Sequence, residues 1–313
     1  FQERIKNSVE LSEAMKFLGS DDVRTKVNVG NGEMMDFLPS RDFHITVDKQ
    51  KVLETGTVKP KDVHLIADRV EFKINKSYIM KNEMAILNMI AANNWERPIY
   101  IDHSLIHTGN IFFTDWLQFE GLAYRFIPIK AGLNRGNTGR IDTDILYENV
   151  MNKFVWGNVN HPDVFLDEYN KREIKIIQAR QMFARLAEAL VNEGKNQKAI
   201  EVLDKMFELF PDEKIPLTFD SFPAAEQYYR AEAVQKANDL VRIMAKNSFE
   251  MLDYYLSLPQ RFARIIQNEQ NREMSHLRNM IIITQRYQQP GLNKEIDDKL
   301  KVLIDRLSAE TGS

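Results

Sequence analysis

The clearest hydrophobic pattern in the chain lies between Arg180 and Pro211, and it predicts two antiparallel helices. Apolar residues recur there at helical spacing on both sides of a Glu-Gly-Lys turn at 193–195, and Pro211 ends the second helix. We therefore expect a helix-turn-helix unit in this segment. Its predicted inward residues are Phe183, Leu186, Ala187 and Leu190 in the first helix, and Ala199, Leu203 and Met206 in the second.

Small and large apolar residues at set positions of two helices, followed by a proline, are typical of a tetratricopeptide repeat, whose period is about 34 residues. A degenerate second unit follows, because Ala237 lies close to one period after Ala199. The apolar positions around it are Ala224, Ala225, Tyr228, Val241 and Met244. Further helical spacing covers 248–264, 269–285 and 293–308, interrupted at Pro259 and at Pro290. The C-terminal half is therefore predicted to be all helical.

Stacked helices of this kind either only bury one another or also leave a concave face for a partner. The second interpretation makes Tyr228 a candidate binding residue of a repeat groove.

The N-terminal half alternates β-branched and aromatic segments with turn signals, which predicts strands. A helix is expected at 77–93 between two of them, so the pattern favours a crossover unit with parallel strands, although the earlier strands are also compatible with a hairpin. Another helix is expected at 143–154, capped by Asp142, and an amphipathic helix at the start, with Ile5, Val9, Ala14 and Leu18 on one side. The predicted strands are 43–47, 63–66, 70–74, 99–101 and 122–129.

These patterns predict an α/β domain, a mixed sheet with flanking helices, over 1–157, followed by an all-α tetratricopeptide-like helical repeat domain over 158–313. The length of 313 residues suits two domains.

Composition narrows the classes of function. With 42 Lys and Arg against 45 Asp and Glu, the chain has no broad basic field for nucleic acid. The absence of Cys excludes disulfides, thiolate metal sites and cysteine nucleophiles. No apolar run reaches the roughly 18 residues that a membrane-spanning helix needs. Because the chain starts at Phe1 without a Met, we expect it to be a piece of a longer protein.

A set of short motifs occurs in a distinctive order along the chain: Asn-Lys-Ser-Tyr at 75–78, Met-Ala-Ile-Leu at 84–87, Asn-Trp-Glu-Arg-Pro-Ile-Tyr at 94–100, Glu-Gly-Leu-Ala-Tyr-Arg at 120–125 with Pro128, Asp-Thr-Asp at 142–144, and Lys153, Phe154, Trp156 and Gly157. Together these motifs resemble the soluble C-terminal region of a family of Bacteroidetes membrane proteins, the domain of unknown function 2723 family, which is grouped with the GT-C glycosyltransferases. The resemblance covers nearly the whole chain.

The resemblance implies a multi-pass parent protein whose membrane portion holds a lipid-linked sugar donor, with this region on the periplasmic side of the cytoplasmic membrane. No position here matches the acidic residues of GT-C chemistry. The resemblance therefore implies an accessory domain without a cofactor that recognises a glycan, a polypeptide acceptor or a partner protein, and that is not catalytic alone.

Asp102, His103, His107 and Asp115 are the best approximation to a metal or acid/base cluster, since the two histidines share a face if the stretch is helical. Gly109 argues against a continuous helix, and a metal site needs three or four converging ligands. We therefore favour a solvated loop and expect no metal.

The segment 130–140 combines glycines with three basic residues, Lys130, Arg135 and Arg140, which suit a phosphate or carboxylate. It lacks the Gly-Lys-Ser/Thr ending of a nucleotide-binding loop. We favour the alternative interpretation, an exposed flexible connection between the strand at 122–129 and the 143–154 helix.

Aromatic residues suggest a third kind of site, because sugar rings stack on flat apolar faces. Trp95, Trp116, Tyr124 and Trp156 are the candidates, but we favour a core or interdomain position for each because an aromatic side chain buries a large area. Trp95 stands in the turn before a strand, so we expect it to be the most exposed of them and a candidate binding residue.

Two functions follow from the sequence. One is an extracytoplasmic accessory domain of a glycosyltransferase-like membrane protein. The other is a free-standing tetratricopeptide-like scaffold for protein partners. A hydrolase centred on His103 is a minor third alternative.

Overall fold

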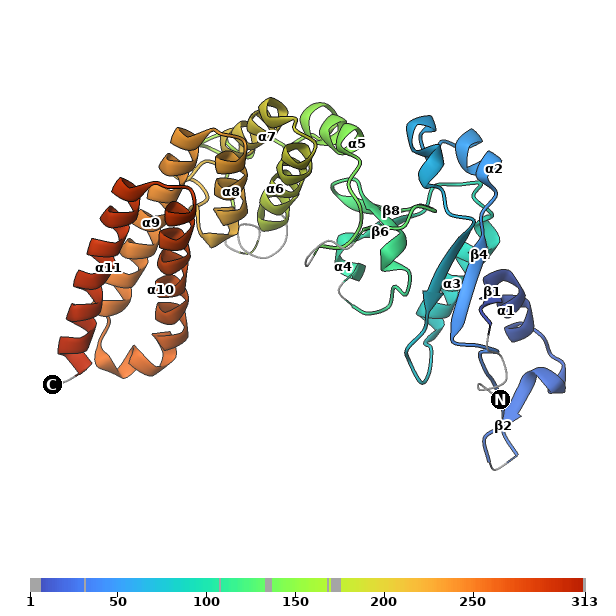
Figure 1. Ribbon diagram of the computed structural model, residues 1–313. Helices are drawn as coiled ribbons and strands as arrows, with labels where there is room; N and C mark the ends of the chain where they lie inside the picture. The colour runs from blue at the N-terminus through green and yellow to red at the C-terminus, as the bar shows by residue number, and fades with distance from the viewer. Residues whose placement is uncertain are drawn as a thin grey trace. The chain divides into compact units, whose positions relative to one another are not determined.

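The computed structural model describes residues 7–30, 32–106, 108–132, 137–167, 169 and 176–311. It divides into two compact units, Phe1–Leu146 and Tyr147–Ser313 (Figure 1). The first mixes short sheets with helices, and the second is helical over about 178–306, which confirms the predicted fold class. The domain boundary after Gly157 stays a prediction. Within the described residues, no helix combines the length and apolar character that crossing a membrane requires.

Three small sheets form the first unit. In one, β1 (Val9–Glu10) runs parallel to β4 (Asp42–Thr46), which pairs antiparallel with β5 (Arg69–Lys73). The third sheet is antiparallel throughout, in the order β6-β8-β7. A separate antiparallel hairpin of β2 and β3 lies between β1 and β4 along the chain. The remaining strand bounds are β2 Lys26–Asn28, β3 Met34–Asp36, β6 Tyr100–Asp102, β7 Leu117–Phe119 and β8 Ala123–Phe126.

The helices of the first unit are short, apart from α3 (Lys81–Asn93), whose end at Asn94 takes the left-handed conformation at φ 42°. Asp142 caps α5 (Thr143–Glu148) by accepting hydrogen bonds from the backbone N–H of Asp144 and Ile145, as predicted. The other helical segments of this unit are α1 Leu11–Leu18, η1 Val23–Thr25, α2 Lys49–Glu54, η2 Pro60–Leu65, α4 His103–Ile106 and η3 Thr114–Trp116. The π-helical turn η4, Asn149–Lys153, follows α5 and belongs to the second unit.

Three local predictions were wrong. The strand-helix-strand pattern around α3 is present, but β5 and β6 belong to different sheets, because β6 pairs with β8 instead. The first helix starts at Leu11, since Val9 pairs with Phe43 in a sheet. The predicted strand at 63–66 falls largely in η2, where Pro60 fixes a helical φ at the start of the segment.

A chain of aromatic rings forms the core between the first and third sheets. Phe43 lies 6.0 Å from Phe72, and Phe72 lies 6.0 Å from Phe113. Phe113 and Trp95 then contact Phe126 of β8, at 5.0 and 5.2 Å between ring centroids. Because these five side chains are all buried, the two sheets share one hydrophobic core.

The second unit confirms the predicted repeat. Helix α6 (Ile176–Asn192) turns at Gly194, with φ 73°, into α7 (Asn196–Leu209), and every predicted inward residue of this pair is buried. A second pair follows, α8 (Phe222–Arg230) and α9 (Val234–Ser257), again with its predicted apolar residues buried. The chain continues with α10 Ala263–Arg286 and α11 Pro290–Thr311, and the short turns η6 Phe219–Ser221 and η7 Gln260–Phe262 precede α8 and α10.

Tyr229 of α8 gives this unit a predicted sensitivity to alkaline pH. Burial is the main cause that raises the pKa of Tyr229 to about 12 from 10.0, with Tyr287 adding to the effect and Arg242 opposing it. A raised phenol pKa stabilises the fold below the unfolded value, and that contribution is lost as pH rises through the folded value. We expect the melting temperature to fall between pH 10 and 12, and Tyr229→Phe to reduce that fall in thermal denaturation scans.

The exposed Tyr254 offers a matched control for this titration. Tyr254→Phe should leave the alkaline profile of the wild type unchanged. An equal effect of both variants would contradict the assignment to Tyr229.

Candidate functional site

Two of the predicted binding residues lie in the core. Trp95 is only 4% exposed, stacks on Phe126 and donates its indole N–H to the carbonyl of Thr46 at 3.3 Å, which corrects the expectation that it is partly exposed. Tyr228 is also buried, and its hydroxyl donates to Asp204 at 2.8 Å. Burial and the Asp204 contact both raise the pKa of Tyr228. Neither side chain presents a surface to a partner in this structure.

The basic segment 130–140 divides into parts with different surroundings. Lys130 is exposed. Arg140 instead makes an ion pair with Asp62 at 2.9 Å, and its backbone forms a parallel bridge with Gln118 of β7. Arg135 lies outside the described residues. The expected open loop is therefore anchored to the sheet at its C-terminal end.

The histidine and aspartate candidates do not form a cluster in the structure. Asp102 accepts hydrogen bonds from the N–H and hydroxyl of Ser104, and the ring of His103 lies 5.8 Å from that of Tyr124. The short helix α4 ends at Ile106, and His107 lies outside the described residues. Among the side chains that the structure describes, no group of three or more His, Asp or Glu is placed to hold a metal ion.

Strand pairing brings four polar side chains into one row on the third sheet. Tyr100 of β6 lies opposite Arg125 of β8, which lies opposite Gln118 of β7. Gln118 is bridged in turn to Arg140. Residues directly opposite one another on neighbouring strands share a face and lie about 5 Å apart. The row therefore places one guanidinium group on each side of the Gln118 amide.

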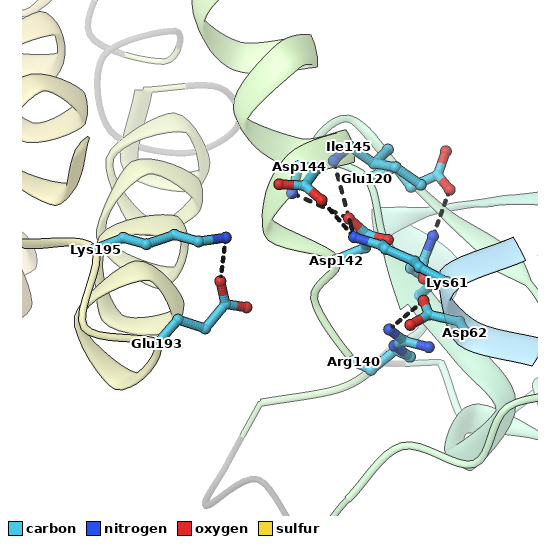
Figure 2. Close-up of polar contacts among 10 residues, drawn as sticks. Lys61, Asp62, Glu120, Arg140, Asp142, Asp144, Ile145, Glu193 and Lys195 are labelled. Atoms are coloured by element: carbon cyan, nitrogen blue, oxygen red, sulfur yellow. Dashed lines mark hydrogen bonds and ion pairs between the residues drawn. The ribbon is translucent and has the colours of Figure 1, made fainter. Parts of the chain in front are cut away.

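Carboxylates border this row, among them Glu120 and Asp62, which Figure 2 labels. Glu120 accepts from the Gln118 amide at 2.8 Å and from the Tyr100 hydroxyl at 3.2 Å, and it lies 3.9 Å from Arg125. Burial and the charge of Glu120 raise the pKa of Tyr100. Each carboxylate is engaged by a neighbour, so the arrangement joins β6, β7 and β8 to the segment that carries Arg140.

Lys61 of η2 continues the network toward α5 (Figure 2). Its ammonium lies 3.2 Å from Asp142 and 2.5 Å from Asp144. Partial burial lowers the pKa of Lys61, but hydrogen bonds to Asp144 and Asp142 outweigh it and raise the pKa above its usual range. The pair in the α6–α7 turn that Figure 2 also draws, Glu193 with Lys195 at 2.6 Å, belongs to the second unit.

A cavity of about 40 Å³ lies against this network, lined by Lys59, Asp62, Gln118, Arg125 and Asp142 together with apolar residues. Arg125 Nε and Arg140 Nη1 are buried and donate to no acceptor among the residues that the structure describes. Such a volume accommodates a few water molecules, and buried hydrogen-bond donors such as these two guanidinium N–H groups commonly bind water. The network therefore has the character of a structural polar core.

A much larger depression, of about 740 Å³, lies between α9 and α11 in the second unit. Its floor is apolar, and both helices also line its walls with apolar side chains. The buried floor residues are Ala245, Leu292, Ile296 and Leu303. The walls add Ile243, Phe249 and Val302, of which Val302 is 64% exposed. We call this depression the α9–α11 groove.

Two ion pairs cross the α9–α11 groove. Arg242 of α9 lies 3.7 Å from Glu295 of α11, and Asp253 of α9 lies 3.1 Å from Arg306 of α11. Since the earlier residue of α9 pairs with the earlier residue of α11, the two helices run parallel. The pairs are separated by three turns, about 16 Å at 1.5 Å per residue.

Sequence reasoning identified the helices of this groove but not the groove itself. The sequence does contain a signal for the groove, because two sets of residues share the spacing i, i+4, i+7 and i+11, one on each helix. The sets are Arg242, Lys246, Phe249 and Asp253 on α9, and Glu295, Lys299, Val302 and Arg306 on α11. Which two stripes face each other depends on tertiary packing, since α10 separates the helices in the chain.

Comparison with known proteins gives one family. Residues 1–145 match the model of the family described as TMEM260-associated domain 2. No curated protein and no solved structure matches the chain. The match covers the sheet-containing unit and leaves the helical unit unassigned.

Proposed function

We propose that this chain is an accessory region of a multi-pass, glycosyltransferase-like membrane protein, and that it binds a glycan, a polypeptide acceptor or a partner protein without being catalytic alone. The observation that carries the proposal is the match of residues 1–145 to a domain named for its association with a membrane protein. The resemblance to the domain of unknown function 2723 family supports the same parent and a position on the periplasmic side of the cytoplasmic membrane. Catalysis by the parent then belongs to its membrane portion.

The chemistry of the first unit favours an acidic ligand. Lys130 is exposed, and Arg135 belongs to the same segment of the sequence, whereas Arg140 is already engaged by Asp62. Cationic side chains recognise sulfate, phosphate and carboxylate groups through charge-assisted hydrogen bonds. A uronic-acid-containing or phosphorylated glycan, or an acidic extended peptide, therefore suits this segment better than a neutral sugar.

Calorimetry of the purified chain against acidic glycans, neutral glycans and acidic peptides tests this function. We expect saturable binding of an acidic ligand that weakens with added salt, because exposed charges are screened within about 10 Å at 0.1 M ionic strength. Lys130→Ala should weaken it about 3- to 10-fold, a loss of roughly 1 kcal/mol. Lys16→Ala removes an exposed charge of the same sign from the same unit and should change the affinity less than twofold.

Binding of neutral glycans alone, or equal effects of Lys130→Ala and Lys16→Ala, would contradict the role of the basic segment. A second candidate function, a free-standing protein-interaction scaffold, is favoured by the apolar α9–α11 groove. It predicts no ligand for the first unit and a protein ligand for the second.

A further inference from the structure

We infer that the α9–α11 groove is the docking site of an amphipathic helix from a partner polypeptide, bound antiparallel to α9 and α11. The inference rests on the proposed binding function and names its partner class for the second unit. It is carried by the shape of the groove, its apolar floor and the charges along its two walls.

The arrangement of the three C-terminal helices leaves one position of a bundle unfilled. Helices α9, α10 and α11 follow one another through short turns (Figure 1). The order of the two ion pairs along the helices shows that α9 and α11 run parallel. Helical bundles pack side chains around a shared core, and the space between two parallel neighbours is where an antiparallel helix fits. An antiparallel helix also sets its positive N-terminus beside the negative C-termini of α9 and α11.

The lining of the groove selects a helix over an extended peptide or a glycan. Both walls are helices whose backbone groups are hydrogen-bonded within the helix, so they offer no ladder for an extended chain. A glycan brings hydroxyl groups that an apolar floor leaves unpaired. A helix satisfies its own backbone and buries only apolar side chains against Phe249, Ile296 and Val302.

The length of the groove fixes the spacing of the partner's contacts. About 16 Å separates the two ion pairs, which corresponds to three helical turns. A partner helix presents apolar residues at i, i+4, i+7 and i+11 over that distance. Four such side chains therefore span the groove between the two ion pairs.

Charges along the walls specify the edges of the partner. The α9 wall begins with Arg242 and Lys246 and ends with Glu250 and Asp253. The α11 wall has the opposite order, since its carboxylates Glu295 and Asp298 precede its cations Lys299 and Arg306. An antiparallel partner is complementary when its α9 edge runs from basic to acidic and its α11 edge runs from acidic to basic. Its edges then replace the two ion pairs that cross the groove in the free chain. Such complementarity governs specificity and orientation.

The test uses a designed helical peptide of 18 residues, which extends beyond both ion pairs at about 1.5 Å per residue. The peptide has leucines at i, i+4, i+7 and i+11 and charges on its two edges that complement the walls. A control peptide of the same composition has its two edges exchanged. In calorimetry with the full chain, we expect the first peptide to bind saturably. The edge-exchanged peptide should bind about 10-fold more weakly, a difference of roughly 1.4 kcal/mol.

Matched variants locate the binding. Val302→Glu places a charge in the groove at a side chain that is already 64% exposed, so the fold tolerates it, and it should weaken the peptide about 10-fold or more. Ile282→Glu makes the same change at a 52% exposed position of α10 outside the groove lining and should change the affinity less than twofold.

Other outcomes overturn the inference. Equal effects of Val302→Glu and Ile282→Glu would exclude the groove as the site. Preference for an extended proline-rich peptide would exclude a helix. Self-association of the chain that Val302→Glu abolishes in sedimentation experiments would assign the groove to a second copy. If the peptide fails to bind while an acidic glycan still binds through Lys130, this inference falls and the proposed function stands.

Discussion

Replacing Arg180 with alanine is expected to lower the free energy of unfolding of the helical unit by about 3–5 kcal/mol, as breaking a buried ion pair commonly does. The Arg180 side chain is 2% exposed and lies 3.0 Å from the carboxylate of Asp220. Its guanidinium also donates to the carbonyls of Phe210, Ile215 and Pro216, at 3.3, 2.6 and 3.2 Å.

These contacts explain the size of the expected effect. Phe210 follows the end of α7, and Ile215 and Pro216 lie in the connection to α8, so one guanidinium satisfies the carbonyls of a segment that has no regular ladder. Alanine leaves those carbonyls and Asp220 without their donor inside the protein. The planar guanidinium group donates hydrogen bonds in several directions at once, which an ammonium group cannot match. Arg180→Lys should therefore recover only part of the lost stability.

Urea denaturation followed by far-ultraviolet circular dichroism measures this loss. The exposed Arg278 of α10 provides the control, and Arg278→Ala should change the free energy of unfolding by less than about 0.5 kcal/mol. A loss below about 1 kcal/mol for Arg180→Ala would mean that solvent replaces the guanidinium, contrary to the buried geometry.

Trp95→Ala should destabilise the sheet-containing unit by about 3–5 kcal/mol, the range for truncating a buried aromatic side chain. The indole lies parallel to the Phe126 ring, with 9° between the planes, and donates to Thr46 on the neighbouring sheet. Trp95 also holds a left-handed backbone conformation, with φ 60°, directly after Asn94 at φ 42°. That pair of residues sharply redirects the chain after α3 and inserts the ring into the core.

Thermal denaturation of Trp95→Ala and Trp95→Phe separates packing from hydrogen bonding. Trp95→Phe keeps a ring in the stack, so we expect a smaller loss than for alanine. Tyr78→Ala removes a 69% exposed aromatic from the same unit and should be nearly neutral. A loss of glycan affinity in Trp95→Ala at unchanged stability would contradict the core assignment.

The helical half was predictable because its signal is local. Apolar residues at helical spacing, the turn at Gly194 and Pro211 describe α6 and α7 without reference to distant contacts. The burial of Leu186 and Leu203 follows from the same periodicity. The predicted interruption at Pro290 is confirmed, since α10 ends at Arg286 and Pro290 is the first residue of α11, a position that proline favours.

The sheet half was less predictable because its strands are short and pair across long separations. β1 has two residues and gains its partner only from β4, so its sequence resembles the start of α1. The sequence predicts an exposed Trp95 because turns usually lie at the surface, but the residue has a left-handed backbone and its side chain is buried. The α9–α11 groove was beyond sequence reasoning for a related reason, since it depends on two helices that α10 separates.

The bridge between Arg140 and Gln118 has a consequence for how this protein avoids unwanted association. The backbone N–H of Phe119 donates to the Arg140 carbonyl at 2.8 Å, and the Arg140 N–H donates to the Leu117 carbonyl at 2.9 Å. These bonds occupy the outer edge of β7, which is otherwise a row of free donors and acceptors open to any extended chain. The segment that supplies Arg140 therefore also covers this edge of β7, and removing its two backbone hydrogen bonds would open the edge to pairing with another extended chain.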